Sequence, residues 1–223
     1  MNILQIIVGA GLLAVAGAAS PVAAQTVPVG KFSSIELRNG GDVTIKYGET
    51  QSVMLVKGDL DNTHIFVNSE GGLVVDRCAK CSHKYEMEVE VVTPEVTAIA
   101  VRDGGTIETI PGFPASSGIA VAVKDGGTID IRSLAVSSVA AAVNSGGRIF
   151  TKPRSSMAAS IKSGGIITYW GKVAVTSAVN DGGVVTRGDA DMEDKPLSAM
   201  GPELSPLPTL APLAPIPAVV RVQ

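Results

Sequence analysis

One eight-residue pattern occurs six times in this chain and constrains its fold more than any other feature. Each copy starts with an aliphatic residue, carries a Gly-Gly pair at its fourth and fifth positions, and has another aliphatic residue at its seventh. The copies are LRNGGDVT (37–44), VRDGGTIE (101–108), VKDGGTID (123–130), VNSGGRIF (143–150), IKSGGIIT (161–168) and VNDGGVVT (179–186). From residue 104 onward the pairs begin at 104, 126, 146, 164 and 182, with spacings of 22, 20, 18 and 18 residues. A period near twenty predicts stacked repeating units.

The residues around each pair predict short strands joined by tight corners. Alternation of the kind in IAVAV (119–123) and TIDI (128–131) is typical of a strand with one buried face. Glycine accepts positive φ and has no Cβ, so the pairs are predicted to form the corners. These structural turn glycines are Gly40, Gly41, Gly104, Gly105, Gly126, Gly127, Gly146, Gly147, Gly164, Gly165, Gly182 and Gly183.

Stacking of such units predicts an all-β fold, a single-stranded β-helix or solenoid. A coil of 18–22 residues has room for three short strands and three corners. Equivalent strands in successive coils would lie ~4.8 Å apart. The general preference of parallel crossovers predicts a right-handed path. The alternative is an antiparallel meander with the glycine pairs in hairpin turns, but hairpins place turn signals about every 8–12 residues. The observed spacing is about twice as long, which favours the solenoid.

Composition agrees with one exported β domain. The chain has 25 Gly, 13 Pro and only 4% aromatic residues, so its core must consist of Val, Ile, Leu and Ala. The net charge is −3 and no basic cluster is present, which argues against a nucleic-acid partner.

Residues 1–24 have the pattern of a secretory signal peptide. The stretch from Ile3 to Ala24 contains only apolar, small or weakly polar residues, and Val22-Ala23-Ala24 before Gln25 resembles a cleavage site. The first five residues contain no Lys or Arg, so an uncleaved membrane anchor is the alternative. We therefore expect an exported protein of the periplasm, cell surface or extracellular space, in contact with a membrane only during export unless the signal stays uncleaved.

Residues 26–100 differ from the later repeats and predict an antiparallel cap. The segment 64–77 has the pattern of a hairpin with its turn at 69–72, and the segment 35–48 has that of a strand, a turn and a strand. In 85–96 the acidic residues at 86, 88 and 90 alternate with apolar residues, which predicts one buried face. A cap is expected because an open β-helix end exposes unpaired backbone groups.

Residues 190–223 are predicted to be a flexible, Pro-rich tail. Seven of the thirteen prolines lie between Pro196 and Pro217, and proline at this density favours extended polyproline II. Two alternatives are a peptide ligand for a partner and apolar packing across the last coil. The second would use Leu207, Leu210, Leu213 and Ile216.

The order of these elements resembles the bacterial head GIN domain, a family described as auto-transporter adhesin heads. The resemblance rests on FSSIELRNGGDVTIKYG, the hairpin ending in LVVDR, the stretch VEVVTPEVTAIAVRDGGTI and the later Gly-Gly coils. It runs from about Phe32 to Gly188, and we assign the domain to residues 26–189. It implies an exported protein with right-handed β-helical coils, an adhesion role and no established enzymatic activity.

Cys78 and Cys81, in the sequence CAKC, are the two cysteines of the chain. In an exported protein, two cysteines three residues apart predict a small disulfide. A redox-active pair is an alternative, although a thioredoxin-like pair should open a helix in a βαβ unit. A metal site is another, because His64 and His83 would complete a Cys₂His₂ set.

The residues before the glycine pairs form a second candidate site. They are Asn39, Asp103, Asp125, Ser145, Ser163 and Asp181, and the residue before them is often cationic, as with Arg102, Lys124 and Lys162. Stacked carboxylates can bridge calcium, but two serines interrupt the column. The calcium-binding nonapeptide of secreted β-rolls is absent. Solvated turn residues are therefore the expected role.

Catalytic residues are scarce in this sequence. Two histidines, both before residue 84, provide no Ser-His-Asp set among the coils. The adjacent aromatic residues Tyr169 and Trp170 are expected to pack in the core or at an edge rather than form a sugar subsite. We predict a non-catalytic binding or adhesion module without a cofactor, whose partner is an envelope or surface component, either a glycan or a protein. The alternative is a carbohydrate-active β-helix enzyme.

Overall fold

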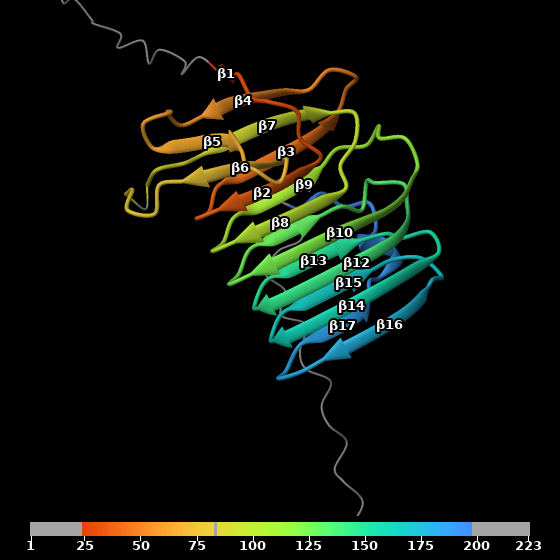
Figure 1. Ribbon diagram of the computed structural model, residues 1–223. Helices are drawn as coiled ribbons and strands as arrows, with labels where there is room; N and C mark the ends of the chain where they lie inside the picture. Colours follow the sequence, from red (N-terminus) through yellow and green to blue (C-terminus); the bar gives the residue numbers. More distant parts are fainter. Residues whose placement is uncertain (1–23, 83, 198–223) are drawn as a thin grey trace, which may run out of the picture.

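The computed structural model describes residues 24–82 and 84–197, and these fold into two large β-sheets (Figure 1). A single 3₁₀ turn, η1 (Ala190–Met192), is the only helical element of the described part. Within these ranges, no helix has the length and apolar character needed to span a membrane. The predicted signal peptide lies almost wholly outside the described residues.

Sheet A has nine strands and sheet B has eight. In spatial order, sheet A contains β1 (Gln25–Val27), β4 (Ser52–Lys57), β7 (Glu88–Thr93), β3 (Asp42–Tyr47), β9 (Thr106–Thr109), β11 (Thr128–Asp130), β13 (Arg148–Thr151), β15 (Ile166–Tyr169) and β17 (Val184–Arg187). Sheet B contains β16 (Ala174–Val179), β14 (Ser156–Ser163), β12 (Val136–Ser145), β10 (Ser116–Lys124), β8 (Ala98–Arg102), β2 (Ser34–Arg38), β6 (Gly72–Arg77) and β5 (Thr63–Val67).

The six Gly-Gly copies correspond to six layers that contain one strand of each sheet. In every layer the chain leaves a sheet B strand, turns at the glycine pair and enters a sheet A strand. Each strand then pairs in parallel with its equivalent in the next layer, as β10 does with β8 and β12. The layers therefore contain two strands each, and the expected three strands per repeat are wrong. Segments such as 110–115 and 131–135 connect the layers and contain no third strand.

A seventh parallel layer lies before the first copy in space although it follows it in sequence. Its strands β6 and β7 pair in parallel with β2 and β3. The corner of this layer is the loop that contains Cys78 and Cys81 rather than a glycine pair. The backbone carbonyl of Met87 accepts a hydrogen bond from the Asp42 amide at 2.9 Å, a role that glycine carbonyls have in later layers.

The predicted antiparallel cap is confined to three strands. β5 pairs with β6 as the expected hairpin, while β1 and β4 extend sheet A antiparallel to β7. The segment 35–48 is part of the parallel array instead, because its two strands lie in different sheets. At this end Lys57 of β4 forms ion pairs with Glu86 and Glu88, which raise the pKa of Lys57. At the cap end, the added antiparallel strands pair with the backbone of the first layer, and charged side chains lie beside them.

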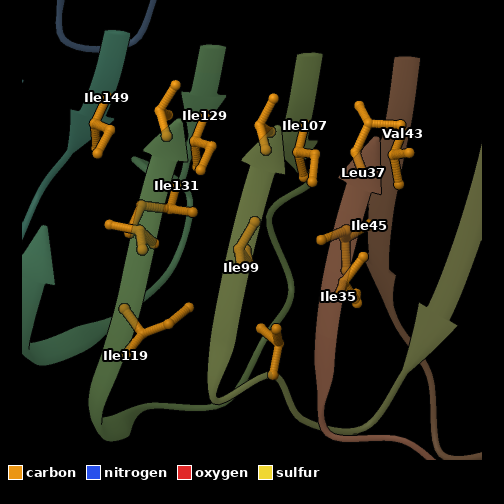
Figure 2. Close-up of a cluster of buried hydrophobic side chains, with 14 of the residues drawn as sticks. Ile35, Leu37, Val43, Ile45, Ile99, Ile107, Ile119, Ile129, Ile131 and Ile149 are labelled. Carbon is orange, nitrogen blue, oxygen red and sulfur yellow. The ribbon is translucent and has the colours of Figure 1, made fainter. Parts of the chain in front are cut away.

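The core consists of columns of aliphatic side chains between the two sheets (Figure 2). In sheet A one column contains Val43, Ile107, Ile129, Ile149 and Ile167, each opposite its equivalent in the neighbouring strand. Every one of them is at most 1% exposed. Because neighbouring strands lie ~4.8 Å apart, these similar aliphatic side chains stack in contact along the column.

The second glycine of each pair is where successive layers approach most closely. A Cβ on Gly147 would lie 3.0 Å from the carbonyl oxygen of Gly127 and would overlap Val123. That same carbonyl accepts a hydrogen bond from the Arg148 amide at 2.9 Å, so the contact cannot relax without loss of the ladder. The first glycine, Gly146, has φ of +66° but open space around its Cβ position. The two glycines therefore have different constraints.

We expect Gly147→Ala to reduce the free energy of unfolding by about 2–3 kcal/mol, because it combines positive φ with steric overlap. Gly146→Ala should cost about 1 kcal/mol, for backbone strain alone. Lys162→Ala, at an exposed position, should change stability by no more than ~0.5 kcal/mol. Chemical denaturation followed by β-sheet circular dichroism measures all three. Equal effects at Gly146 and Gly147 would contradict the close approach of layers.

Candidate binding face

The outer face of sheet B presents two rows of small side chains, which we call the alanine face. Inward residues of β8, β10, β12 and β14 alternate with outward ones, and the outward positions are half-buried or exposed. Strand register aligns them into two rows, Ala98, Ala120, Ala140 and Ala158 in the first, and Ala100, Ala122, Ala142 and Ser160 in the second. This face was not predicted from the sequence. The signal that could have revealed it is the recurrence of small residues at alternate positions in AIA (98–100), AVA (120–122), AAA (140–142) and AAS (158–160).

Alanine at these positions is not explained by stability. It is among the residues depleted in strands, and an exposed methyl group packs against little. β-Branched or charged residues would stabilise an exposed strand face at least as well. The repeated choice of alanine leaves the backbone of four adjacent strands accessible to a flat molecule.

A groove of about 500 Å³ lies over the alanine face. Its floor is formed by the two alanine rows, and Asn68, Glu70 and Gly72 of the β5–β6 hairpin line one end. The Asn68 side chain fixes this hairpin, because its Oδ1 accepts hydrogen bonds from the amides of Glu70 and Gly72 at 3.0 and 2.9 Å. These bonds order the turn of the hairpin at this end of the groove.

Charged residues border the alanine face on the neighbouring strand β2 and at or near the ends of β8, β10 and β14. Glu36 continues the second alanine row into β2, and its carboxylate accepts a hydrogen bond from Arg38 at 2.8 Å and pairs with Arg102. The hydrogen bond to Glu36 raises the pKa of Arg38. Lys124 and Lys162 occupy equivalent ends of β10 and β14 and are exposed. The border therefore offers cationic and hydrogen-bonding groups beside an apolar floor.

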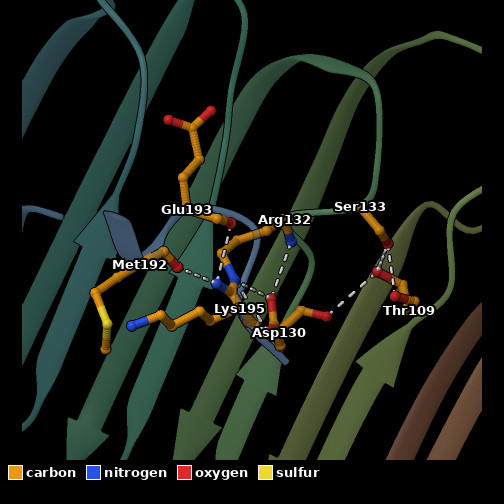
Figure 3. A network of polar contacts seen from close by, with 7 residues as sticks. All are labelled: Thr109, Asp130, Arg132, Ser133, Met192, Glu193 and Lys195. Carbon is orange, nitrogen blue, oxygen red and sulfur yellow. Dashed lines mark hydrogen bonds and ion pairs between the residues drawn. The ribbon is translucent and has the colours of Figure 1, made fainter. Parts of the chain in front are cut away.

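The outer face of sheet A is partly covered by the chain itself (Figure 3). Arg132 donates hydrogen bonds to the carbonyls of Met192, Glu193 and Lys195, at 2.8, 3.1 and 2.7 Å. It also forms an ion pair with Asp130, and its side chain is only 8% exposed. The segment 192–195 belongs to the predicted flexible tail, yet these bonds hold it against the sheet.

Aromatic rings complete this arrangement. The Arg132 guanidinium lies over the rings of Phe150 and Trp170, 5.7 and 5.2 Å from their centroids. Trp170 is 2% exposed, and its indole N–H donates to the carbonyl of Asp189 at 2.8 Å. Trp170 is thus buried beneath Arg132 and residue 189, which agrees with the expected packing in the core or at an edge, and its ring is not accessible to a sugar.

The predicted disulfide between Cys78 and Cys81 is present, and the described residues contain no free cysteine. Its loop is tied to the rest of the fold by Arg77, which donates to the carbonyls of Asn39 and Ser82 at 3.2 and 3.0 Å. His83, which the alternative metal site would require, lies outside the described residues. Within those residues, no group of three or more His, Cys, Asp or Glu side chains could hold a metal ion.

The residues before the glycine pairs adopt the left-handed conformation in four layers. Asn39, Asp103, Asp125 and Asp181 have φ between 49° and 60°. Asn and Asp tolerate this conformation better than other side chains. Backbone geometry therefore accounts for these residues without a bound cation.

Neither a protein-family model nor a curated protein matches this sequence. Among solved structures, a protein described as "a putative adhesin" from Bacteroides fragilis NCTC 9343 is similar at 14% identity and a TM-score of 0.42, covering 74% of this chain and 95% of that one. A "putative lipid binding protein" from Parabacteroides distasonis ATCC 8503 is similar at 11% identity and a TM-score of 0.39, covering 75% and 96%. We draw no conclusion about this chain from likenesses at such TM-scores.

We expect Arg132→Ala to lower the free energy of unfolding by about 3 kcal/mol, because it leaves the nearly buried Asp130 carboxylate without its partner. The variant should also release the segment 192–195, so that cleavage after Glu193 by a glutamyl endopeptidase becomes faster. Lys152→Ala is the matched control, since its ion pair with Glu193 is more exposed and should contribute less than ~1 kcal/mol. Equal protease resistance of the natural chain and Arg132→Ala would contradict this role.

Proposed function

We propose that this protein is an exported, non-catalytic binding module of the adhesion type, and that the alanine face is its binding surface. The observation that carries the proposal is the pair of small-residue rows across four adjacent strands, beneath a groove that no part of the described chain fills. Sheet A, by contrast, has part of its outer face covered by residues 189–195. Within the described chain, part of the sheet A face is thus covered, whereas the alanine face of sheet B is accessible.

The ligand that fits this surface is an extended molecule lying across the strands. Small side chains let a flat partner approach the sheet closely, and each contact then contributes dispersion and burial of apolar area. The equivalent positions repeat every ~4.8 Å, so the surface suits a polymer with many similar contacts. Arg102, Lys124 and Lys162 along one side supply hydrogen bonds and charge. A polysaccharide or an extended polypeptide of the cell envelope has these properties.

The layered sheets support the finer assignment of the fold. We infer that the seven parallel layers are coils of a right-handed β-solenoid of the head GIN type, with two strands per coil. Support comes from the parallel pairing of every layer with the next and from the resemblance of residues 32–188 to that family. The domain then spans 26–189, with the residues to 195 anchored on its surface.

Export is the remaining part of the proposal. It rests on the apolar residues 1–24 and on the Cys78–Cys81 disulfide, which forms and persists in an oxidising compartment. We assign the mature protein to the periplasm, the cell surface or the extracellular space.

Intact-mass measurement of the exported protein tests this part. The mature chain should begin at or near Gln25, and its mass should be lower than that of the reduced form by two hydrogens. Recovery of Met1 on a membrane-embedded product would replace the signal peptide by an anchor. Free thiols after non-reducing preparation would contradict the oxidising compartment.

An array of envelope polysaccharides and proteins tests the binding surface. Ala140 lies in the middle of the first row, so Ala140→Glu should weaken binding of the selected component at least tenfold, about 1.4 kcal/mol, through steric and charge interference. The control is Thr186→Glu, at an exposed position on sheet A, which should leave affinity unchanged. Both variants should retain stability within ~0.5 kcal/mol. Unaltered binding by Ala140→Glu would place the site elsewhere.

A further inference from the structure

The groove over the alanine face has polar groups at its ends as well as an apolar floor. Besides the alanines, its lining includes Ser34, Glu36, Asn68, Glu70 and Ser160. The Asn68 carboxamide uses its oxygen to accept the two hydrogen bonds of the hairpin turn, at 3.0 and 2.9 Å. Within the residues that the structure describes, its Nδ2 group donates no hydrogen bond, so it is a donor that a ligand can use.

The charges beside this groove compensate one another. Glu36 forms ion pairs with Arg38, at 2.8 Å, and with Arg102. Lys124 lies 3.6 Å from the carboxylate of Asp125. A polyanion or a polycation lying over the floor would therefore find no row of uncompensated charge of the opposite sign.

Two further charges near the groove form no ion pair within the described part of the chain. One is Lys162 at the end of β14, and the other is Glu70 in the β5–β6 hairpin, where it lines the groove. They have opposite signs, and β14 and the hairpin lie at different ends of sheet B. The charge pattern as a whole thus favours a neutral ligand.

The repeat distance of the floor distinguishes between neutral polymers. Equivalent positions of neighbouring strands lie ~4.8 Å apart, and the register aligns the alanines of β8, β10, β12 and β14 at this interval. In an extended polypeptide, the side chains of one face repeat every ~6.6 Å, twice the rise per residue. They would meet the alanine rows differently in each layer, so a polypeptide does not match the period of the floor.

Extended glycans of equatorially linked pyranose rings match this period. Each ring with its glycosidic bond advances by about one strand spacing, so a chain lying across the sheet places one ring over each strand. The faces of such a ring carry C–H groups, and its hydroxyl groups project from the edges. The faces can therefore bury apolar area on alanine methyl groups, while the hydroxyl groups form hydrogen bonds with carboxamides, carboxylates and other hydroxyls.

We propose that the alanine face binds a neutral, extended glycan of equatorially linked pyranose rings, with one ring over each of β8, β10, β12 and β14. At the hairpin end, the glycan forms hydrogen bonds with Ser34 and with the Nδ2 group of Asn68. This inference rests on the proposed function, because it names the class of ligand for the same surface. The number of aligned alanine layers then sets the number of rings that contact the floor.

Calorimetric titration of the exported protein with cello-oligosaccharides and chito-oligosaccharides of increasing length tests the proposal. In at least one series, affinity should rise about threefold or more per added ring up to the fourth. It should level off by the fifth or sixth ring, because the residues that line the groove end at β14. Maltohexaose, whose axial linkages curve the chain, is the matched control for cellohexaose and should bind at least about tenfold more weakly.

Salt dependence gives an independent measurement on the same complexes. A neutral ligand on a compensated surface should lose less than about twofold in affinity when the salt concentration rises tenfold. A polyanion held by lysine and arginine side chains would lose far more.

Substitutions in the first alanine row locate the rings. Ala140→Glu, in the middle of the row, should lower the affinity for the hexasaccharide at least about tenfold. Ala158→Glu, in the last alanine layer, should abolish the gain from the fourth ring and leave the affinity for the trisaccharide within about twofold. Thr186→Glu on sheet A is the control and should leave the whole length series unchanged.

The outcomes separate this inference from the proposed function. Equal affinity for maltohexaose and cellohexaose, or no binding in either series, would overturn the glycan assignment. Binding of polygalacturonate or of an envelope polypeptide that is weakened by Ala140→Glu would also overturn it, but would keep the alanine face as the binding surface. Glycan binding that Ala140→Glu leaves unchanged would contradict both.

Discussion

The close contact between glycine corners of successive layers is the constraint on which the rest of this structure depends. In the first five of the six pairs, the carbonyl of the second glycine accepts a hydrogen bond from the amide that follows the next pair, at 2.9–3.0 Å. A side chain there would meet the backbone of the neighbouring layer. Only glycine lets both sheets keep the ~4.8 Å strand spacing through the corner. The register of the core columns and the rows of the alanine face follow from that spacing.

The two sheets bury their inner faces against each other, but the side chains on their outer faces differ. Sheet A carries Asp130, Arg132 and Trp170, which bind the chain that follows the last layer. Sheet B carries alanines, which bind no described residue and add little stability. A protein selected for stability alone has no reason for this difference, because β-branched residues would suit both faces. The difference is the main structural support for a binding role of sheet B.

Parallel pairing between layers builds the array, but it also leaves unpaired backbone groups at both ends. Parallel stacking satisfies every interior strand but leaves the terminal ones with unpaired backbone groups. At the first end the chain uses the β5–β6 hairpin and two antiparallel strands, with charged residues beside them. At the last end β16 has neither. The residues that follow β17 do not extend this end, because Arg132 binds the carbonyls of Met192, Glu193 and Lys195 beside β11, three strands away.

Local sequence patterns determined much of this protein: the six repeats, the alternating strands, the β5–β6 hairpin and the Cys78–Cys81 disulfide all follow from residues close together in the chain. Tertiary structure decided the features that depend on distant pairing. The number of strands per layer depends on how the sheets close over the core, which no single repeat specifies. The insertion of β6 and β7 as a layer beside β2 and β3 depends on pairing between residues some forty positions apart. The role of Arg132 depends on contacts sixty residues apart, and no period in the sequence marks them.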